Sequence, residues 1–296
     1  MQEHTAEKYA ELFDTMGVLS HAGVAAYRTK TIKAGRMLEA ECFPIFAGRA
    51  DVMRLQEKKR RVPPEVMKRA NERNSMKKMQ RLAHANFGEG DFWVTVTYAQ
   101  GESITREQAM KDMRNYIARI QRARKRAGLE QTKYIYVVEW GETTGRIHCH
   151  IIMERMDWDT VHGLWKHGRT EVQKLQEDEK QGLAECVKYM LKKTTPNPQG
   201  IRRKEKAWVA SKGMKQPEET RSDRKVSRRK VEKIAKAMVG DMSEARAIFE
   251  KAYPGYKLAS VNVKLCEWAT GAYIYATMYK EERNAPRRGQ RTSSAV

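Results

Sequence analysis

Two histidines stand two residues apart in the segment RIHCHIIM, which runs from Arg146 to Met153. Successive side chains of a strand point to opposite faces, so on a strand His148 and His150 share one face. Two imidazoles side by side can bind a metal ion, although a pair of hydrogen-bonded surface histidines has the same spacing. Two imidazoles alone are a weak ligand set, and hard divalent ions also need oxygen ligands. Glu139, at the end of the preceding segment YIYVVEW, is the candidate for the carboxylate ligand.

The segment ECVKYMLKKT, residues 185–194, holds a candidate nucleophile. On a helix Tyr189, Lys192 and Lys193 occupy neighbouring positions of one face, because residues three and four apart are adjacent. A phenol has a pKa of about 10 and ionises at neutral pH only with help, which nearby cations provide. On this interpretation Tyr189 attacks a phosphate and a lysine holds that phosphate. A partly buried tyrosine beside surface lysines is the alternative that the sequence leaves open.

Alternating strands and helices are predicted around these residues. Residues 92–98, 134–140, 146–153 and 170–175 have the composition of strands. A T-x-x-Q capping box at 105–108 begins an amphipathic helix, and a shorter and a longer helix are predicted near 157–165 and 179–193. The short loop GETTG makes the second and third strands an antiparallel hairpin, which brings Glu139 beside His148 and His150. The predicted fold is α+β, a mostly antiparallel sheet with helices on one face and the histidines on the uncovered face.

The chain has 296 residues and a formal net charge of +21. This excess attracts polyanions and releases their counterions, so nucleic acid is the leading partner. No apolar run approaches about 18 residues and no lipidation signal is present, so no membrane partner is expected. A polar, acidic N-terminal segment and four scattered cysteines indicate a cytoplasmic protein with reduced thiols. The absence of a G-x-x-x-x-G-K-[ST] motif predicts that no P-loop ATPase domain is present.

Three regions are predicted along the chain. Residues 1–88 form a basic helical N-terminal region, residues 89–200 form the α+β domain, and residues 201–296 contain a basic linker, helices and a C-terminal β-hairpin. The strands of that hairpin are KLASVNVKLCEW and GAYIYATMY. Candidate DNA-binding cations lie at the end of the helix that follows the capping box, together with Lys193: they are Arg122, Arg124, Lys125 and Arg126.

Three short motifs follow one another along the chain, FWVTVTY at 92–98, HCH at 148–150 and YMLK at 189–192. In this order and spacing they resemble the motifs of the HUH endonucleases, and more narrowly of the rolling-circle replication initiators of phages, plasmids and integrative elements. The resemblance implies the HUH nuclease fold, with Tyr189 as the nucleophile and Lys192 as the residue that positions the phosphate. It also implies that Glu139, His148 and His150 bind Mg²⁺ or Mn²⁺.

The resemblance further implies site-specific nicking and joining of single-stranded DNA through a 5′-phosphotyrosine intermediate, which starts rolling-circle replication. The implied partners are single-stranded or hairpin origin DNA, a host helicase and a host DNA polymerase. Glu185 and Cys186 stand where some initiators have a second tyrosine, so the resemblance is to a single-tyrosine enzyme. Unlike many viral relatives, the sequence shows no helicase domain.

Two other functions are left open by the sequence. A mobilisation relaxase uses the same chemistry, but relaxases usually place the tyrosine before the histidine motif, whereas Tyr189 follows it. A non-catalytic basic nucleic-acid-binding protein would rely on the net charge alone. The activity of such a protein would survive both His148→Ala and Tyr189→Phe.

Overall fold

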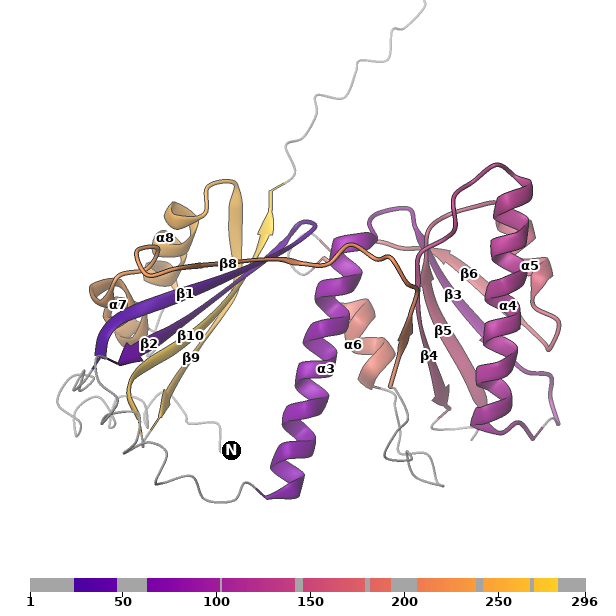
Figure 1. The fold of residues 1–296 in the computed structure, drawn as a ribbon, viewed down its shortest axis with the longest axis horizontal. Helices are drawn as coiled ribbons and strands as arrows, with labels where there is room; N and C mark the ends of the chain where they lie inside the picture. Colours follow the sequence, from indigo (N-terminus) through magenta and orange to yellow (C-terminus); the bar gives the residue numbers. More distant parts are fainter. Residues whose placement is uncertain are drawn as a thin grey trace, which may run out of the picture.

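Two five-stranded antiparallel sheets make up the computed structural model, which describes residues 24–46, 63–101, 103–141, 146–178, 182–192, 207–237, 242–266 and 269–281 (Figure 1). Sheet A has the strand order β8-β1-β2-β10-β9, and sheet B has the order β6-β3-β5-β4-β7. The helices α3 to α8 pack on these sheets, so the predicted α+β class is confirmed. Among the described residues, no helix is both long enough and apolar enough to cross a membrane.

Sheet B contains the four strands and three helices that the sequence predicts, in the predicted order, and a fifth strand, β7, that was not predicted. Its strands are β3 (Phe92–Thr97), β4 (Tyr134–Trp140), β5 (Ile147–Met153), β6 (Thr170–Lys174) and β7 (Val209–Ala210). Its helices are α4 (Arg106–Arg126), α5 (Trp158–Leu164) and α6 (Ala184–Lys192). The predicted cap of α4 is confirmed, because the Thr105 hydroxyl accepts a 3.2 Å hydrogen bond from the backbone N–H of Gln108.

One face of sheet B packs against α4 and α5. Ile147, Cys149 and Ile151 of β5 point to this face and share a core with Met113 of α4 and Val161 of α5. The neighbouring residues His148 and His150 therefore point to the opposite face, as the period of two along a strand requires. The apolar half of RIHCHIIM thus holds the strand in place while the polar half stays available.

The opposite face of sheet B is only partly uncovered, and here the prediction of a bare face was wrong. Helix α3 (Pro64–Asn86) and helix α6 both pack on it. Leu82 of α3 and Val187 of α6 share a core with Ile135, Val137 and Ile152 of the sheet. The apolar stripe of α3 is short and lies among many cations, so its sequence gives little indication of the surface that it covers.

Sheet A is built from strands near the beginning and near the end of the described chain. Its strands are β1 (Val24–Ala34), β2 (Met37–Phe46), β8 (Glu218–Ser222), β9 (Tyr256–Cys266) and β10 (Ala269–Lys280), and α7 (Arg228–Ala237) and α8 (Ser243–Ala252) cover one of its faces. The predicted C-terminal hairpin is confirmed as β9 and β10. The prediction that residues 1–88 are helical was wrong for 24–46, which form two strands. Strands β1 and β2 form a hairpin with each other, and β2 also pairs with the distant strand β10.

Helix α3 lies between the two sheets, with α7 and α8 beyond sheet A and α4 and α5 beyond sheet B (Figure 1). Arg81 of α3 binds Glu39 and Glu41 of β2, while Leu82 packs towards sheet B. The turn between β1 and β2 also touches α3, because a Cβ atom on Gly35 would overlap the backbone carbonyl of His84. The same helix therefore contacts both sheets, through a polar face on one side and an apolar face on the other.

Candidate active site

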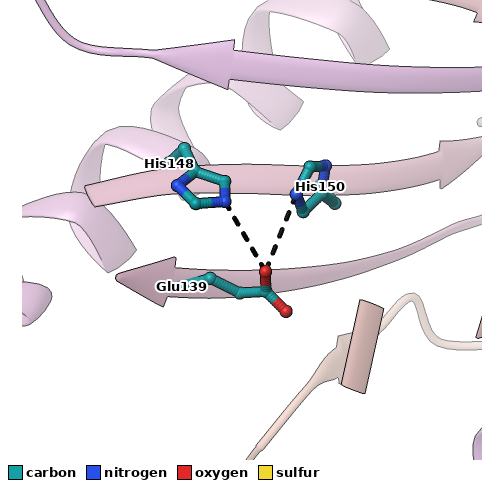
Figure 2. Close-up of side chains that lie close together, drawn as sticks. All are labelled: Glu139, His148 and His150. Carbon is teal, nitrogen blue, oxygen red and sulfur yellow. Dashed lines mark ion pairs between the residues drawn. The ribbon is translucent and has the colours of Figure 1, made fainter. Parts of the chain in front are cut away.

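Three potential metal ligands meet at one end of the β4–β5 hairpin (Figure 2). Glu139 lies directly across from His148 in the strand register, as the tight hairpin predicts. The Nε2 atoms of His148 and His150 each lie 3.6 Å from Oε2 of Glu139. One ligand atom from each residue lies within 4.8 Å of the other two, so one divalent ion could contact all three.

The burial of the three ligands leaves one side of the group accessible. The side chain of Glu139 is fully buried and that of His150 is 4% exposed, whereas that of His148 is 17% exposed. Three protein ligands with an accessible side leave coordination positions for water or a phosphate oxygen, which is the arrangement of catalytic sites and not of closed structural ones.

The Nδ1 atoms of both histidines have hydrogen-bond partners of their own. Nδ1 of His148 lies 3.5 Å from the carbonyl oxygen of Arg146, which can only accept, so the proton of the neutral ring belongs on Nδ1. Nδ1 of His150 lies 3.0 Å from the hydroxyl oxygen of Thr95, which can accept in the same way. Both rings can therefore present an Nε2 lone pair towards Glu139, and this donor set fits a divalent metal ion.

Cys149, which lies between the two histidines in the chain, takes no part in this group. Its side chain is fully buried in the core under α4. Burial raises the pKa of the Cys149 thiol, so the sulfur stays protonated at neutral pH. A protonated thiol on the other face of the sheet does not compete with the imidazoles for a metal ion.

Tyr189 stands over the metal-ligand group from helix α6. The centroid of its ring lies 5.4 Å from that of His150 and 5.9 Å from that of Trp93, in edge-on contacts. The tyrosine is 44% exposed, although Val187 and Met190 on the same helix are buried against sheet B. Packing of those two residues therefore places the phenol beside the imidazoles and leaves it open to an incoming strand.

Two residues of β3 support the site and were not found from the sequence. Trp93 contacts both His150 and Tyr189, with ring centroids 5.2 Å apart in the pair with His150. Thr95 holds Nδ1 of His150. The alternation within FWVTVTY gives a usable signal, since it places Trp93, Thr95 and Thr97 on one face, and β3 pairs with β5. The sequence does not show that β3 pairs with β5, so it could not place these residues beside the histidines.

A groove of about 500 Å³ opens beside His148. Thr97 and Arg146 line it, together with Arg169 and Glu171 from the edge strand β6 and the loop before it. Arg169 is exposed, and Arg146 donates a hydrogen bond to the backbone carbonyl of Tyr98. The groove reaches the metal-ligand group from the side where His148 is accessible, and two arginines make it suitable for a phosphate chain.

The predicted lysines and arginines have different outcomes. Lys192 is the last residue of α6, but its side chain lies outside the described residues, as does Lys193 entirely. Arg124 is buried and donates hydrogen bonds to the backbone carbonyls of Glu130 and Arg155, so its side chain is committed to the fold. This contradicts its predicted role in DNA binding.

The other cations near Arg124 lie away from the site. Arg122, Lys125 and Arg126 are exposed, so DNA contacts by these three residues stay a prediction. They belong to α4, which covers the face of sheet B that points away from the metal-ligand group. Gln121 in the same turn bonds to Thr132, before the start of β4, whereas Glu139 lies at the end of that strand. Any DNA on these cations therefore lies outside the candidate active site.

A comparison with known protein families gave a match over part of the chain. Residues 91–194 match the model of the family described as Replication-associated protein ORF2. The matched segment runs from β3 to the end of α6 and includes Glu139, His148, His150 and Tyr189. Comparisons with curated proteins and with solved structures gave no match. Residues 91–194, which contain four of the five strands of sheet B and the metal-ligand group, are therefore similar to the Replication-associated protein ORF2 family.

Proposed function

We propose that this protein is a replication initiator that nicks and rejoins single-stranded DNA with Tyr189 as its nucleophile. The observation that carries the proposal is the 5.4 Å contact between the rings of Tyr189 and His150, one of three potential metal ligands. The tyrosine is 44% exposed, so a DNA strand can reach its phenol. The family match to replication-associated proteins supports the same function.

Glu139, His148 and His150 would hold Mg²⁺ or Mn²⁺, which suit two imidazoles with a carboxylate and further oxygen ligands. When bound, the ion would polarise a non-bridging oxygen of the scissile phosphate. Thr95 and the backbone of Arg146 would keep both imidazoles in the orientation that this role needs. Lys192 is proposed to position the same phosphate from the end of α6.

The phenol oxygen of Tyr189 would attack the phosphorus in line with the leaving oxygen. A bond forms between the tyrosine oxygen and phosphorus, the bond to the 3′ oxygen breaks, and the phenol loses a proton as the leaving oxygen gains one. The products are a free 3′-hydroxyl and a 5′-phosphotyrosine on the protein. The number of phosphodiester bonds is conserved, so attack by a 3′-hydroxyl reverses the step without ATP.

The free 3′-hydroxyl would serve as a primer for a host DNA polymerase in the cytoplasm, and a host helicase would supply the strand separation. Single-stranded or hairpin DNA from the origin is the proposed substrate. The groove beside His148 supports this choice, because Arg169 and Arg146 flank the path of a strand that reaches the exposed side of the metal-ligand group.

A denaturing gel tests the proposal. The protein is mixed with labelled single-stranded DNA from its own replicon, with Mn²⁺ or with a chelator. We expect a metal-dependent covalent DNA–protein band that disappears in Tyr189→Phe. Tyr134→Phe is the matched control, since Tyr134 lies at the other end of β4, on the face covered by α4, and loses the same hydroxyl. A band that persists in Tyr189→Phe, or no band with any origin-spanning strand, would refute the proposed chemistry.

A further inference from the structure

Sheet A has a second groove, separate from the metal-ligand group. Helices α7 and α8 cover one face of this sheet, and α3 crosses its other face. Between α3 and that face lies a groove of about 690 Å³. We call it the α3 groove and define it by six of its lining residues, namely Arg73, Lys77, Asn262, Lys264, Tyr275 and Ser260. None of these residues belongs to the segment that matches the replication-associated family.

Positive charge gathers around one aromatic ring in the α3 groove. The Nζ atoms of Lys77 and Lys264 lie 5.1 and 5.6 Å from the centroid of the Tyr275 ring. Arg73 lines the same groove one helical turn before Lys77. Among the described residues, neither Arg73 nor Lys264 forms an ion pair. The groove therefore holds cationic groups whose charge the protein itself does not neutralise.

The carboxylates in the same groove are already paired. Glu39 and Glu41 lie on β2, where Arg81 binds both of them and Lys77 lies 3.8 Å from Glu41. These contacts use the C-terminal half of α3. Glu41 lies across from Tyr275 in the strand register, so Arg81 and Lys77 neutralise the carboxylate nearest the ring, and Arg73 and Lys264 are further cations of the same groove.

Lys264 is partly buried beside two other cations. Its pKa is lowered, first by burial and then by the nearby charges of Arg73 and Lys77. The charges of Arg73 and Lys77 therefore make Lys264 harder to protonate. A bound anion would reverse this effect, which indicates that the cluster is arranged for an anionic ligand.

We propose that the α3 groove binds single-stranded DNA, with phosphates on Arg73, Lys77 and Lys264 and a base against Tyr275. A cationic groove combined with an aromatic ring is the arrangement by which proteins bind single strands without sequence preference. Ser260 and Asn262 on β9 add hydroxyl and amide groups that can bond to bases or phosphates. The volume is that of a small-ligand pocket, which suits a strand threaded between a helix and a sheet better than a double helix.

Helix α3 lies between the two sheets (Figure 1), and it packs on the face of sheet A that lines the α3 groove and on the face of sheet B that carries His148 and His150. The strand that reaches Tyr189 could therefore continue along α3 to sheet A. The choice of DNA as the ligand rests on the proposed function. The binding itself does not depend on cleavage, so the two proposals can fail separately.

Anisotropy of labelled oligo(dT) tests the groove in the full chain, with Tyr189→Phe and a chelator present so that no strand is cut. Arg73→Ala/Lys264→Ala should weaken binding by about tenfold or more and lower the slope of log affinity against log salt by about 1.4, given about 0.7 for each phosphate contact on a single strand. The matched control is Arg246→Ala/Lys251→Ala, which removes the same charge from α8 on the other side of sheet A. Tyr275→Leu should weaken binding without changing the slope.

Three results would overturn the proposal. The Arg73/Lys264 variant could keep the affinity and the salt slope of the parent. The control variant could lose as much as the groove variant, which would mean that only net charge matters. The groove variant could lose affinity for a dA·dT duplex but not for oligo(dT). If instead the groove variant loses oligo(dT) binding while Tyr189 forms no covalent band in the gel, the groove stands and the proposed chemistry fails.

Discussion

Replacing Thr95 by valine should weaken Mn²⁺ binding by about ten- to a hundredfold, the usual effect of removing a hydrogen bond that orients a metal-binding histidine. The Thr95 hydroxyl lies 3.0 Å from Nδ1 of His150, whose Nε2 points to Glu139. Valine keeps the shape of the side chain and the β-branch, so the strand should stay intact. The loss corresponds to about 1.4–2.7 kcal/mol of binding free energy. About 0.5–1.5 kcal/mol of it is the hydrogen bond itself, and the remainder reflects freedom gained by the ring.

Thr97 provides the control for this variant, because it lies two residues along the same strand and on the same face. Its hydroxyl donates to the backbone carbonyl of Arg169 at 3.3 Å and not to a histidine. Thr97→Val therefore removes an equal group from a neighbouring position on the same face, and Mn²⁺ affinity should change by less than about threefold.

Isothermal titration calorimetry with Mn²⁺ measures both variants beside the parent, and thermal denaturation shows that all three remain folded. Wild-type affinity in Thr95→Val would mean that His150 does not bind the ion through Nε2. An equal loss in Thr97→Val would mean that the strand, and not the hydrogen bond, controls the site. In either case the assignment of Glu139, His148 and His150 as a preorganised ligand set would fail.

Three further predictions concern stability. Burial, with a smaller effect from Arg36, lowers the pKa of His84 to about 4, so between pH 6.5 and 4 the unfolded chain binds a proton that the folded chain does not. The free energy of unfolding, measured in urea, should therefore fall by about 3 kcal/mol as the pH is lowered over that range. His84→Gln should make the free energy of unfolding less dependent on pH. Gly35→Ala should lower the free energy of unfolding by about 3 kcal/mol or more, because the strain of a φ of 55° adds to the overlap of the new Cβ atom with the His84 carbonyl. Gly90 has a φ of 86° but open space around it, so Gly90→Ala should lower the free energy of unfolding by only about 1–2 kcal/mol in the same experiment. Arg124→Ala should lower the free energy of unfolding by about 3 kcal/mol, because the Arg124 side chain donates hydrogen bonds to two backbone carbonyls. It should leave unchanged the slope of log oligo(dT) affinity against log salt. An unchanged melting temperature together with a reduced slope would restore the predicted role of Arg124 in DNA binding.

The position of Glu139 beside His148 could be predicted because a tight hairpin fixes the register of its two strands. The alternation along β3 predicts that Thr95 and Thr97 share one face of the strand. It does not predict that they lie beside the histidines, because β3 and β5 are more than 50 residues apart and no local rule specifies their pairing. The contact of Tyr189 with His150 could not be obtained from spacing along the chain. It depends on how Val187 and Met190 pack against Ile152, which is a property of the assembled core.

Strands β1 and β2 were missed for a different reason. Their α3-facing side carries Arg28, Lys30, Glu39 and Glu41, and these charges hide the alternation that marks a strand. In the structure the charges are paired, Arg28 with Asp223 and Lys30 with Glu219 of the neighbouring segment and strand. The partners lie almost 200 residues away. A charge pattern of this kind is read as a solvated helix until its partners are known.

The pairing of β2 with β10 has a consequence for how the chain is made. Met37 pairs with Tyr279, so sheet A cannot close until nearly the whole described chain has left the ribosome. The four longer strands of sheet B, in contrast, all lie between Phe92 and Lys174 and can assemble much earlier. During synthesis β2 therefore presents an unsatisfied edge for a long time, which is the condition under which strands pair with the wrong neighbour. Its alternating Glu39 and Glu41 are charges of the kind that discourage such pairing, and they acquire their final partner, Arg81, only when α3 docks.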